Sequence, residues 1–114
     1  MAQLPEEITT TVLELQRRLL VVIDRATATG FAILQQYGET ETTLIALEDL
    51  DNVRERANTY YSRFHTLLVR IAESQPFADT AMLELLNRSI EQAQATVEAA
   101  QATIQEEKRN FNIP

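Results

Sequence analysis

The sequence predicts an all-α protein, folded as an elongated antiparallel up-down-up three-helix bundle with heptad, coiled-coil-like packing. Only two glycines and three prolines interrupt its 114 residues, which favours long helices. Apolar residues recur at alternating spacings of three and four in three segments, as on one face of a helix. The connections between these segments are short, so neighbouring helices should be antiparallel. We expect one domain over residues 1–114, with helices at about residues 5–37, 43–74 and 78–111.

The first expected helix begins at Pro5, a residue suited to the first helical position, and two glutamates follow at the positive end of the helix dipole. Gly38 ends it. Gly30 lies on the apolar seam, and because the seam keeps its phase there we expect a continuous helix. A glycine at this place lets another helix approach closely, at a cost of about 1 kcal/mol relative to alanine. The seam consists of Ile8, Val12, Leu15, Leu19, Val22, Ala26, Thr29, Ile33 and Tyr37.

The second and third expected helices each carry one apolar face of their own. The second ends at Ser74-Gln75-Pro76, and Asp79 is the expected N-cap of the third. The third is rich in alanine and glutamine, which form helices readily and allow close packing. Helices of this length should measure roughly 45 Å. Their apolar faces comprise Leu50, Val53, Ala57, Tyr60, Tyr61, Phe64, Leu67, Leu68 and Ile71, and then Leu83, Leu86, Ile90, Ala93, Val97, Ala100, Ile104 and Phe111.

The first helix carries a second apolar column besides its seam. Leu13, Leu20 and Leu34 are spaced in sevens with Thr27 filling the gap, and Phe31 lies beside them. The apolar arc then covers about half of the circumference, although a core-facing stripe needs little more than about 100°. This helix could be central and touch both partners, or part of the surface could meet another chain. We favour the second interpretation.

Two further sets of residues are candidates for an interface. Val21 faces nearly opposite the main seam of the first helix. A polar column in the third helix flanks its apolar seam, and polar groups at such an edge help to set the register and the choice of partner. The column consists of Asn87, Gln94, Gln101 and Lys108. The complete set of interface candidates is therefore Leu13, Leu20, Val21, Phe31, Leu34, Gln94 and Gln101.

Composition excludes several classes of function. The net charge is −7 and the cationic side chains are dispersed among carboxylates, so binding to nucleic acid or to an anionic membrane is not expected. The sequence contains no cysteine, which excludes disulfides and thiolate chemistry. We find no apolar stretch of about 18 residues and no signal peptide, so a cytoplasmic location is expected. We expect no cofactor.

The one histidine is the only candidate for covalent chemistry. The stretch FHTLL around His65 resembles the phosphoacceptor stretch of histidine phosphotransfer domains, which are also small, acidic helical bundles. That resemblance would make His65 a phosphoacceptor. In the family a lysine and a small residue follow, whereas Leu68 and Val69 occupy those places here. The missing lysine removes a cation that would hold a phosphoryl group, and we favour a structural histidine.

An enzyme and a metal site are both disfavoured by the distribution of charge. The stretch DNVRE at residues 51–55, on three helices, resembles the all-helical chorismate mutases, which bind a dianionic substrate through several cations. No lysine or arginine lies between Ala26 and Val53, where five carboxylates gather instead, so a dicarboxylate would be repelled. The carboxylates lack the spacing of calcium or di-iron ligands. We expect no catalytic residue and no metal.

The expected function is therefore non-enzymatic. The chain should be a small interaction, adaptor or regulatory protein that forms a homo-oligomer such as a dimer, or binds a helix of a protein partner. A histidine phosphotransfer-like module that uses His65 is the alternative.

Overall fold

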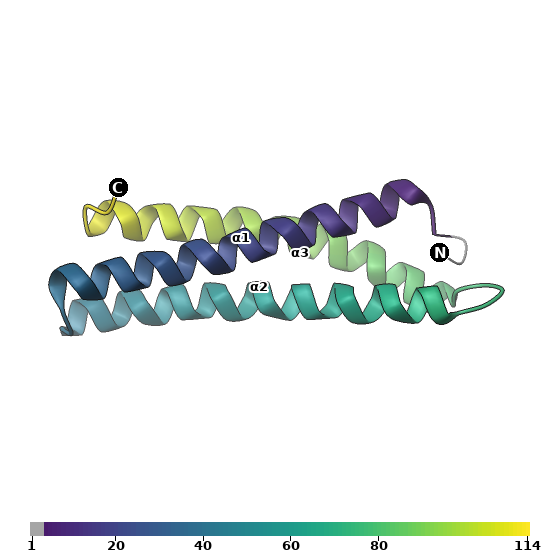
Figure 1. Cartoon of the computed structure of the whole chain (residues 1–114), viewed down its shortest axis with the longest axis horizontal. Coiled ribbons are helices and arrows are strands. Elements are labelled where there is room, and N and C mark those ends of the chain that lie inside the picture. The colour runs from purple at the N-terminus through teal and green to yellow at the C-terminus, as the bar shows by residue number, and fades with distance from the viewer. Residues whose placement is uncertain (1–3) are drawn as a thin grey trace.

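The computed structural model describes residues 4–114, and within this range the chain forms three long helices (Figure 1). They are α1 (Glu6–Tyr37), α2 (Glu41–Glu73) and α3 (Thr80–Asn110). The chain runs up, down and up along a rod of 56 × 19 × 17 Å. This confirms the predicted all-α, elongated three-helix bundle. Over the described residues, none of the helices is long and apolar enough to cross a membrane.

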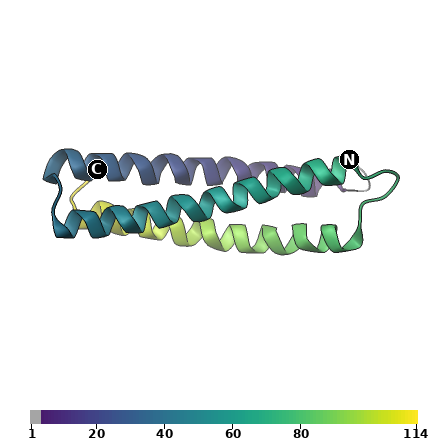
Figure 2. The same cartoon turned by 90° about the horizontal axis from the view of Figure 1, so that it is seen from below.

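The core lies along the axis of the rod, where the three helices face one another (Figure 2). The predicted apolar faces supply it almost entirely. Phe64 is the largest fully buried side chain, and Tyr60, Tyr61 and Leu68 of the same helix are half-buried at its edge. The buried apolar residues of α1 are Val12, Leu15, Leu19, Val22, Ala26 and Ile33, which are the seam residues that the spacing predicts. α1 also continues without a break through Gly30.

Side-chain caps determine where α2 and α3 begin. The Thr40 hydroxyl accepts a hydrogen bond from the backbone N–H of Thr43, and the Thr43 hydroxyl accepts one from the backbone N–H of Thr40. This reciprocal capping box starts α2 two residues earlier than expected. Asp79 caps α3 as predicted, because its carboxylate accepts a hydrogen bond of 2.8 Å from the N–H of Ala81. Thr80 is consequently the first residue of α3, two residues later than expected.

The C-terminal end of α3 is tied to the end of α1. Asn112 adopts a left-handed conformation with φ of 53°, and the N–H of Ile113 donates to the carbonyl of Lys108 at 2.8 Å. These are features of a Schellman motif, which satisfies the last carbonyls of a helix. The ring of Phe111 then packs edge-on against Tyr37, and the Tyr37 hydroxyl donates to the Phe111 carbonyl at 2.7 Å.

Candidate functional site

The second apolar column of α1 remains exposed in the folded chain. Leu13 is 53% exposed, Leu20 49%, Phe31 65% and Leu34 36%. α1 contacts both α2 and α3, yet it does so through its buried seam. Contact within the chain therefore does not cover this column.

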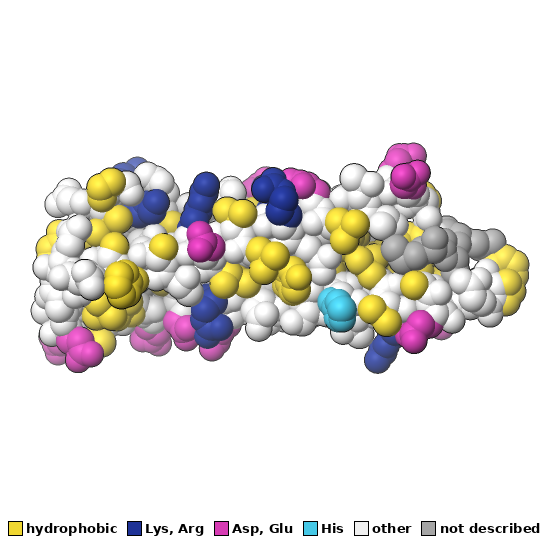
Figure 3. Space-filling model, viewed as in Figure 1, with side chains coloured by type: hydrophobic (Ala, Val, Ile, Leu, Met, Phe, Trp, Pro, Cys, Tyr) yellow, Lys and Arg dark blue, Asp and Glu magenta, His cyan; other side chains and the backbone are white. Residues whose placement is uncertain are grey.

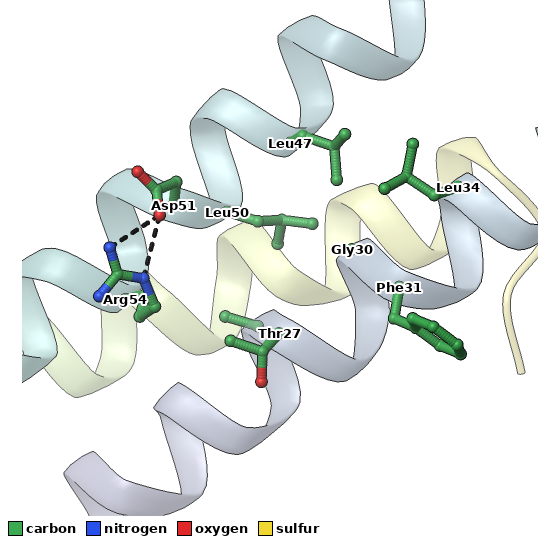
Figure 4. Close-up of a pocket in the computed structure, with 9 residues that line it drawn as sticks. Thr27, Gly30, Phe31, Leu34, Leu47, Leu50, Asp51 and Arg54 are labelled. Carbon is green, nitrogen blue, oxygen red and sulfur yellow. Dashed lines mark hydrogen bonds and ion pairs between the residues drawn. The ribbon is translucent and has the colours of Figure 1, made fainter. Parts of the chain in front are cut away.

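A groove between α1 and α2 lies next to the C-terminal half of this column. It has a volume of about 460 Å³ and is mostly apolar. Figure 4 shows Leu34 of α1 and Leu47 of α2 near each other at one end, with Leu50 deeper between the helices. The lining is completed by Ala26, Thr27, Gly30, Phe31, Asp51 and Arg54.

Gly30 allows the two helices to approach closely at the floor of the groove. A Cβ atom at this position would lie 3.1 Å from Leu47 Cδ2 and 3.8 Å from Leu50 Cδ1. The Leu47 side chain of α2 therefore lies close to the position of the missing Cβ, and a larger residue of α1 would require it to move. This agrees with the close approach predicted from the position of the glycine on the seam.

A charged pair closes the other end of the groove. Arg54 forms an ion pair of 2.9 Å with Asp51 one turn earlier on α2, and its Nε donates to the same carboxylate oxygen at 3.0 Å. Thr27 of α1 lies opposite, and its hydroxyl donates to the backbone carbonyls of Ile23 and Asp24. The hydroxyl is thus satisfied, while the Arg54 side chain remains 37% exposed.

The two rows of residues that line this groove continue along both helices. Steps of seven lead from Leu34 back to Leu13 on α1, and from Leu47 forward to Leu68 on α2. A hydrogen bond of 3.4 Å from Gln16 Nε2 to the Tyr61 carbonyl joins the helices beyond the groove. The groove brings Thr27 to the level of Arg54, and Leu34 to the level of Leu47. Continued in steps of seven along the two antiparallel helices, the rows give two further levels, Leu20 with Tyr61 and Leu13 with Leu68.

We call these eight residues together with Phe31 the α1–α2 strip. Figure 3 looks onto this side of the rod, where hydrophobic side chains appear at several places along its length, with charged side chains between them. Three levels of the strip consist of leucine and tyrosine, and one, the polar level, consists of Thr27 and Arg54. Large exposed apolar surface on a folded chain is typical of a protein interaction site.

The α2 half of the strip was not among the interface candidates of the sequence analysis. Leu47 lies before the apolar face that the sequence predicts for this helix, and Tyr61 and Leu68 resemble ordinary core residues there. The sequence pattern that could have indicated this half of the strip is the spacing of seven from Leu47 to Leu68 through Arg54 and Tyr61. Leu44 and Ile45, near the turn between α1 and α2, are also exposed, at 52% and 63%.

The remaining interface candidates lie elsewhere. Val21 is half-buried between α1 and α3, where it lines a small hollow of about 140 Å³ with Gln101, Arg25 and Lys108. Gln94 is exposed on α3. The structure therefore places Val21 and Gln101 together in a second groove, apart from the strip.

His65 is exposed on α2, one turn after Tyr61 of the strip. Its neighbour Leu68 is half-buried and Val69 is 43% exposed. A response regulator docking beside His65 would therefore meet bulky apolar side chains, where the phosphotransfer family has a lysine and a small residue.

A group of carboxylates lies between α2 and α3. Glu107 is largely buried there, close to Asp49 and Glu106, and Arg56 lines the same hollow. Burial raises the pKa of Glu107, and the negative charges of Asp49 and Glu106 raise it further. Among residues 4–114, no group of three or more histidine, aspartate or glutamate side chains could hold a metal ion.

Comparison of the chain with protein-family models, with curated proteins and with solved structures finds no match. Function is therefore inferred from the surface of the bundle, where the α1–α2 strip is exposed and mostly apolar.

Proposed function

We propose that this chain is a small non-enzymatic interaction protein that binds a further α-helix along the α1–α2 strip. The helix belongs either to a second copy of the chain or to a protein partner. The observation that supports this is the exposure of Leu13, Leu20, Phe31 and Leu34 on one side of α1, where Phe31 and Leu34 also line an apolar groove. Burying one exposed leucine or phenylalanine stabilises an assembly by about 1.5–3 kcal/mol before the costs of association.

The spacing of the strip suits a helix as its ligand. Its residues recur every seven positions on two adjacent helices, so they form rows parallel to the bundle axis, with the apolar groove beside the C-terminal half of α1. A helix with its own apolar residues at heptad spacing can place them in such a groove. An adaptor or regulatory role follows from this mode of binding, because the chain would connect other helical proteins without changing them chemically.

The proposal is tested with one variant in the strip and one matched control. Leu20→Glu introduces a charge at the centre of the strip. Leu85→Glu introduces the same charge at a leucine of α3 that is 38% exposed outside it. We expect both variants to keep the helical circular dichroism of the wild type.

The solution mass of each protein is measured by size-exclusion chromatography with light scattering from micromolar concentrations upwards. Assembly that is lost with Leu20→Glu but kept with Leu85→Glu supports the proposal. If the wild type is a monomer, the wild type and the two variants serve as baits for protein partners. We then expect partner binding to be lost with Leu20→Glu and kept with Leu85→Glu. Equal behaviour of the three proteins in both measurements would refute the proposal.

A further inference from the structure

We infer that the occupant of the α1–α2 strip is a second copy of the same chain, related by a two-fold axis that runs parallel to the helices. This inference rests on the proposed function and specifies its partner. In such a dimer, α1 of each copy packs against α2 of the other copy. The four helices form one shared core, and α3 of each copy lies on the outside.

The succession of levels along the strip supports this arrangement. A two-fold axis parallel to the helices places every level of one copy against the same level of the other. The three leucine and tyrosine levels then meet apolar levels only. Each α1 also lies antiparallel to both α2 helices beside it, as in a four-helix bundle with short loops.

The charges of the polar level complement one another in the same arrangement. Arg54 and Asp51 are one turn apart and partly exposed on the same edge of α2. When this level meets its own copy, each guanidinium can reach the carboxylate of the other chain. A single polar level within an apolar interface is a known means of determining the register and the number of helices. Thr27 needs no hydrogen-bond partner from the other chain, because its hydroxyl already donates to the backbone.

A two-fold axis perpendicular to the helices gives a less favourable dimer. It would reverse the order of the levels, so the polar level of one copy would meet Leu20 and Tyr61 of the other. The Arg54–Asp51 pair of each copy would then be buried against apolar side chains with no further polar partner, which is costly. The polar level therefore selects the parallel arrangement.

The size of the surface agrees with a dimer. From Leu13 to Leu34 the strip spans 21 steps of the helix, or roughly 32 Å. Across the 19 Å width of the bundle, the face measures roughly 600 Å² for each copy. That lies at the lower end of the area that stable interfaces bury per partner.

The orientation is tested by distances between spin labels. The chain has no cysteine, so Thr42→Cys and Ala72→Cys each provide one label, at exposed sites near opposite ends of α2. In the inferred dimer, each variant gives a separation on the scale of the 19 Å width of the bundle. Separations close to its 56 Å length for both variants, or a monomeric wild type, would overturn the inference.

The polar level is tested by reversing its charges. Arg54→Glu places four carboxylates in one level of the dimer, and we expect the dissociation constant to rise at least about ten-fold. The double variant Asp51→Arg/Arg54→Asp restores two opposite pairs and should recover most of the wild-type affinity. An unchanged dissociation constant for Arg54→Glu overturns the inference.

These outcomes separate the inference from the proposed function. Two outcomes refute only the parallel self-dimer and leave the proposed function intact. One is a monomer that captures another protein through Leu20. The other is a dimer that Leu20→Glu disrupts but whose label distances are those of the antiparallel arrangement. A dimer that Leu20→Glu does not affect refutes both.

Discussion

Replacing Gly30 by alanine should stabilise the protein, although the glycine is buried against α2. Gly30 lies within a continuous helix, where alanine is favoured by about 1 kcal/mol. The added Cβ would lie 3.1 Å from Leu47 Cδ2, so that methyl group must move by a few tenths of an ångström. Leu47 is half-buried at an open groove, which leaves it space to move. The expected net gain in the free energy of unfolding is about 0.5–1 kcal/mol.

Gly38 provides the opposite expectation within the same chain. A Cβ at this position would meet no atom within 4 Å, but the residue has φ of 67° and ψ of −166°. Side chains disfavour this region strongly whatever the space around them. Gly38→Ala should therefore reduce the free energy of unfolding by about 1–3 kcal/mol.

Both glycine variants are measured by urea unfolding followed by circular dichroism at one protein concentration, since any self-association makes stability depend on concentration. We expect a higher urea midpoint for Gly30→Ala and a lower one for Gly38→Ala. A loss of more than about 1 kcal/mol in Gly30→Ala would show that Leu47 cannot move and that the groove is rigid. An unchanged or higher urea midpoint for Gly38→Ala would refute the expectation based on the backbone angles of Gly38.

Three further variants test the interior and the ends of the bundle. The Ser89 hydroxyl is fully buried without a hydrogen-bond partner among the described residues. Ser89→Ala should therefore raise the free energy of unfolding, measured by urea titration, by about 1 kcal/mol. A lower free energy of unfolding would indicate that the hydroxyl makes a hydrogen bond. Folding raises the pKa of Glu107 above its ordinary value of 4.5. Ionisation of Glu107 therefore destabilises the folded state as the pH rises through the raised pKa. Below pH 4.5 the carboxyl is protonated in both states, and this destabilisation is absent. Glu107→Gln should thus raise the melting temperature at pH 7 but not below about pH 4; an equal gain at both pH values would contradict a role for the charge. Tyr37→Phe removes the hydroxyl bond to Phe111 and should lower the free energy of unfolding by about 0.5–1 kcal/mol, with no loss expected if the C-terminal turn is frayed in solution.

The helices and their buried faces could be predicted because they depend on local patterns. The seam of α1 from Val12 to Ile33 follows from apolar spacing. Asp79 could be predicted as the N-cap of α3 because capping depends only on residues close to it in the chain. The second column with Leu13 and Leu20 was also visible as excess apolar surface. Spacing on one helix, however, cannot show which of two apolar columns the other helices cover.

The α2 half of the strip could not be predicted, for the same physical reason. Leu47 belongs to the strip only because α1 approaches α2 at Gly30, and Arg54 lies opposite Thr27 only in the observed register of the two helices. The same holds for Glu107, whose raised pKa depends partly on Asp49 of another helix.

Helix periodicity and caps act over a few residues, so the amino-acid pattern alone predicts three long helices with one buried face each. The rotation of each helix and the levels that lie side by side are visible only in the folded chain, because they depend on close packing between residues far apart in the sequence. The contact between Tyr37 and Phe111 is of this kind. The exposed strip is of the same kind, since it is what remains of the apolar surface after the three helices have packed.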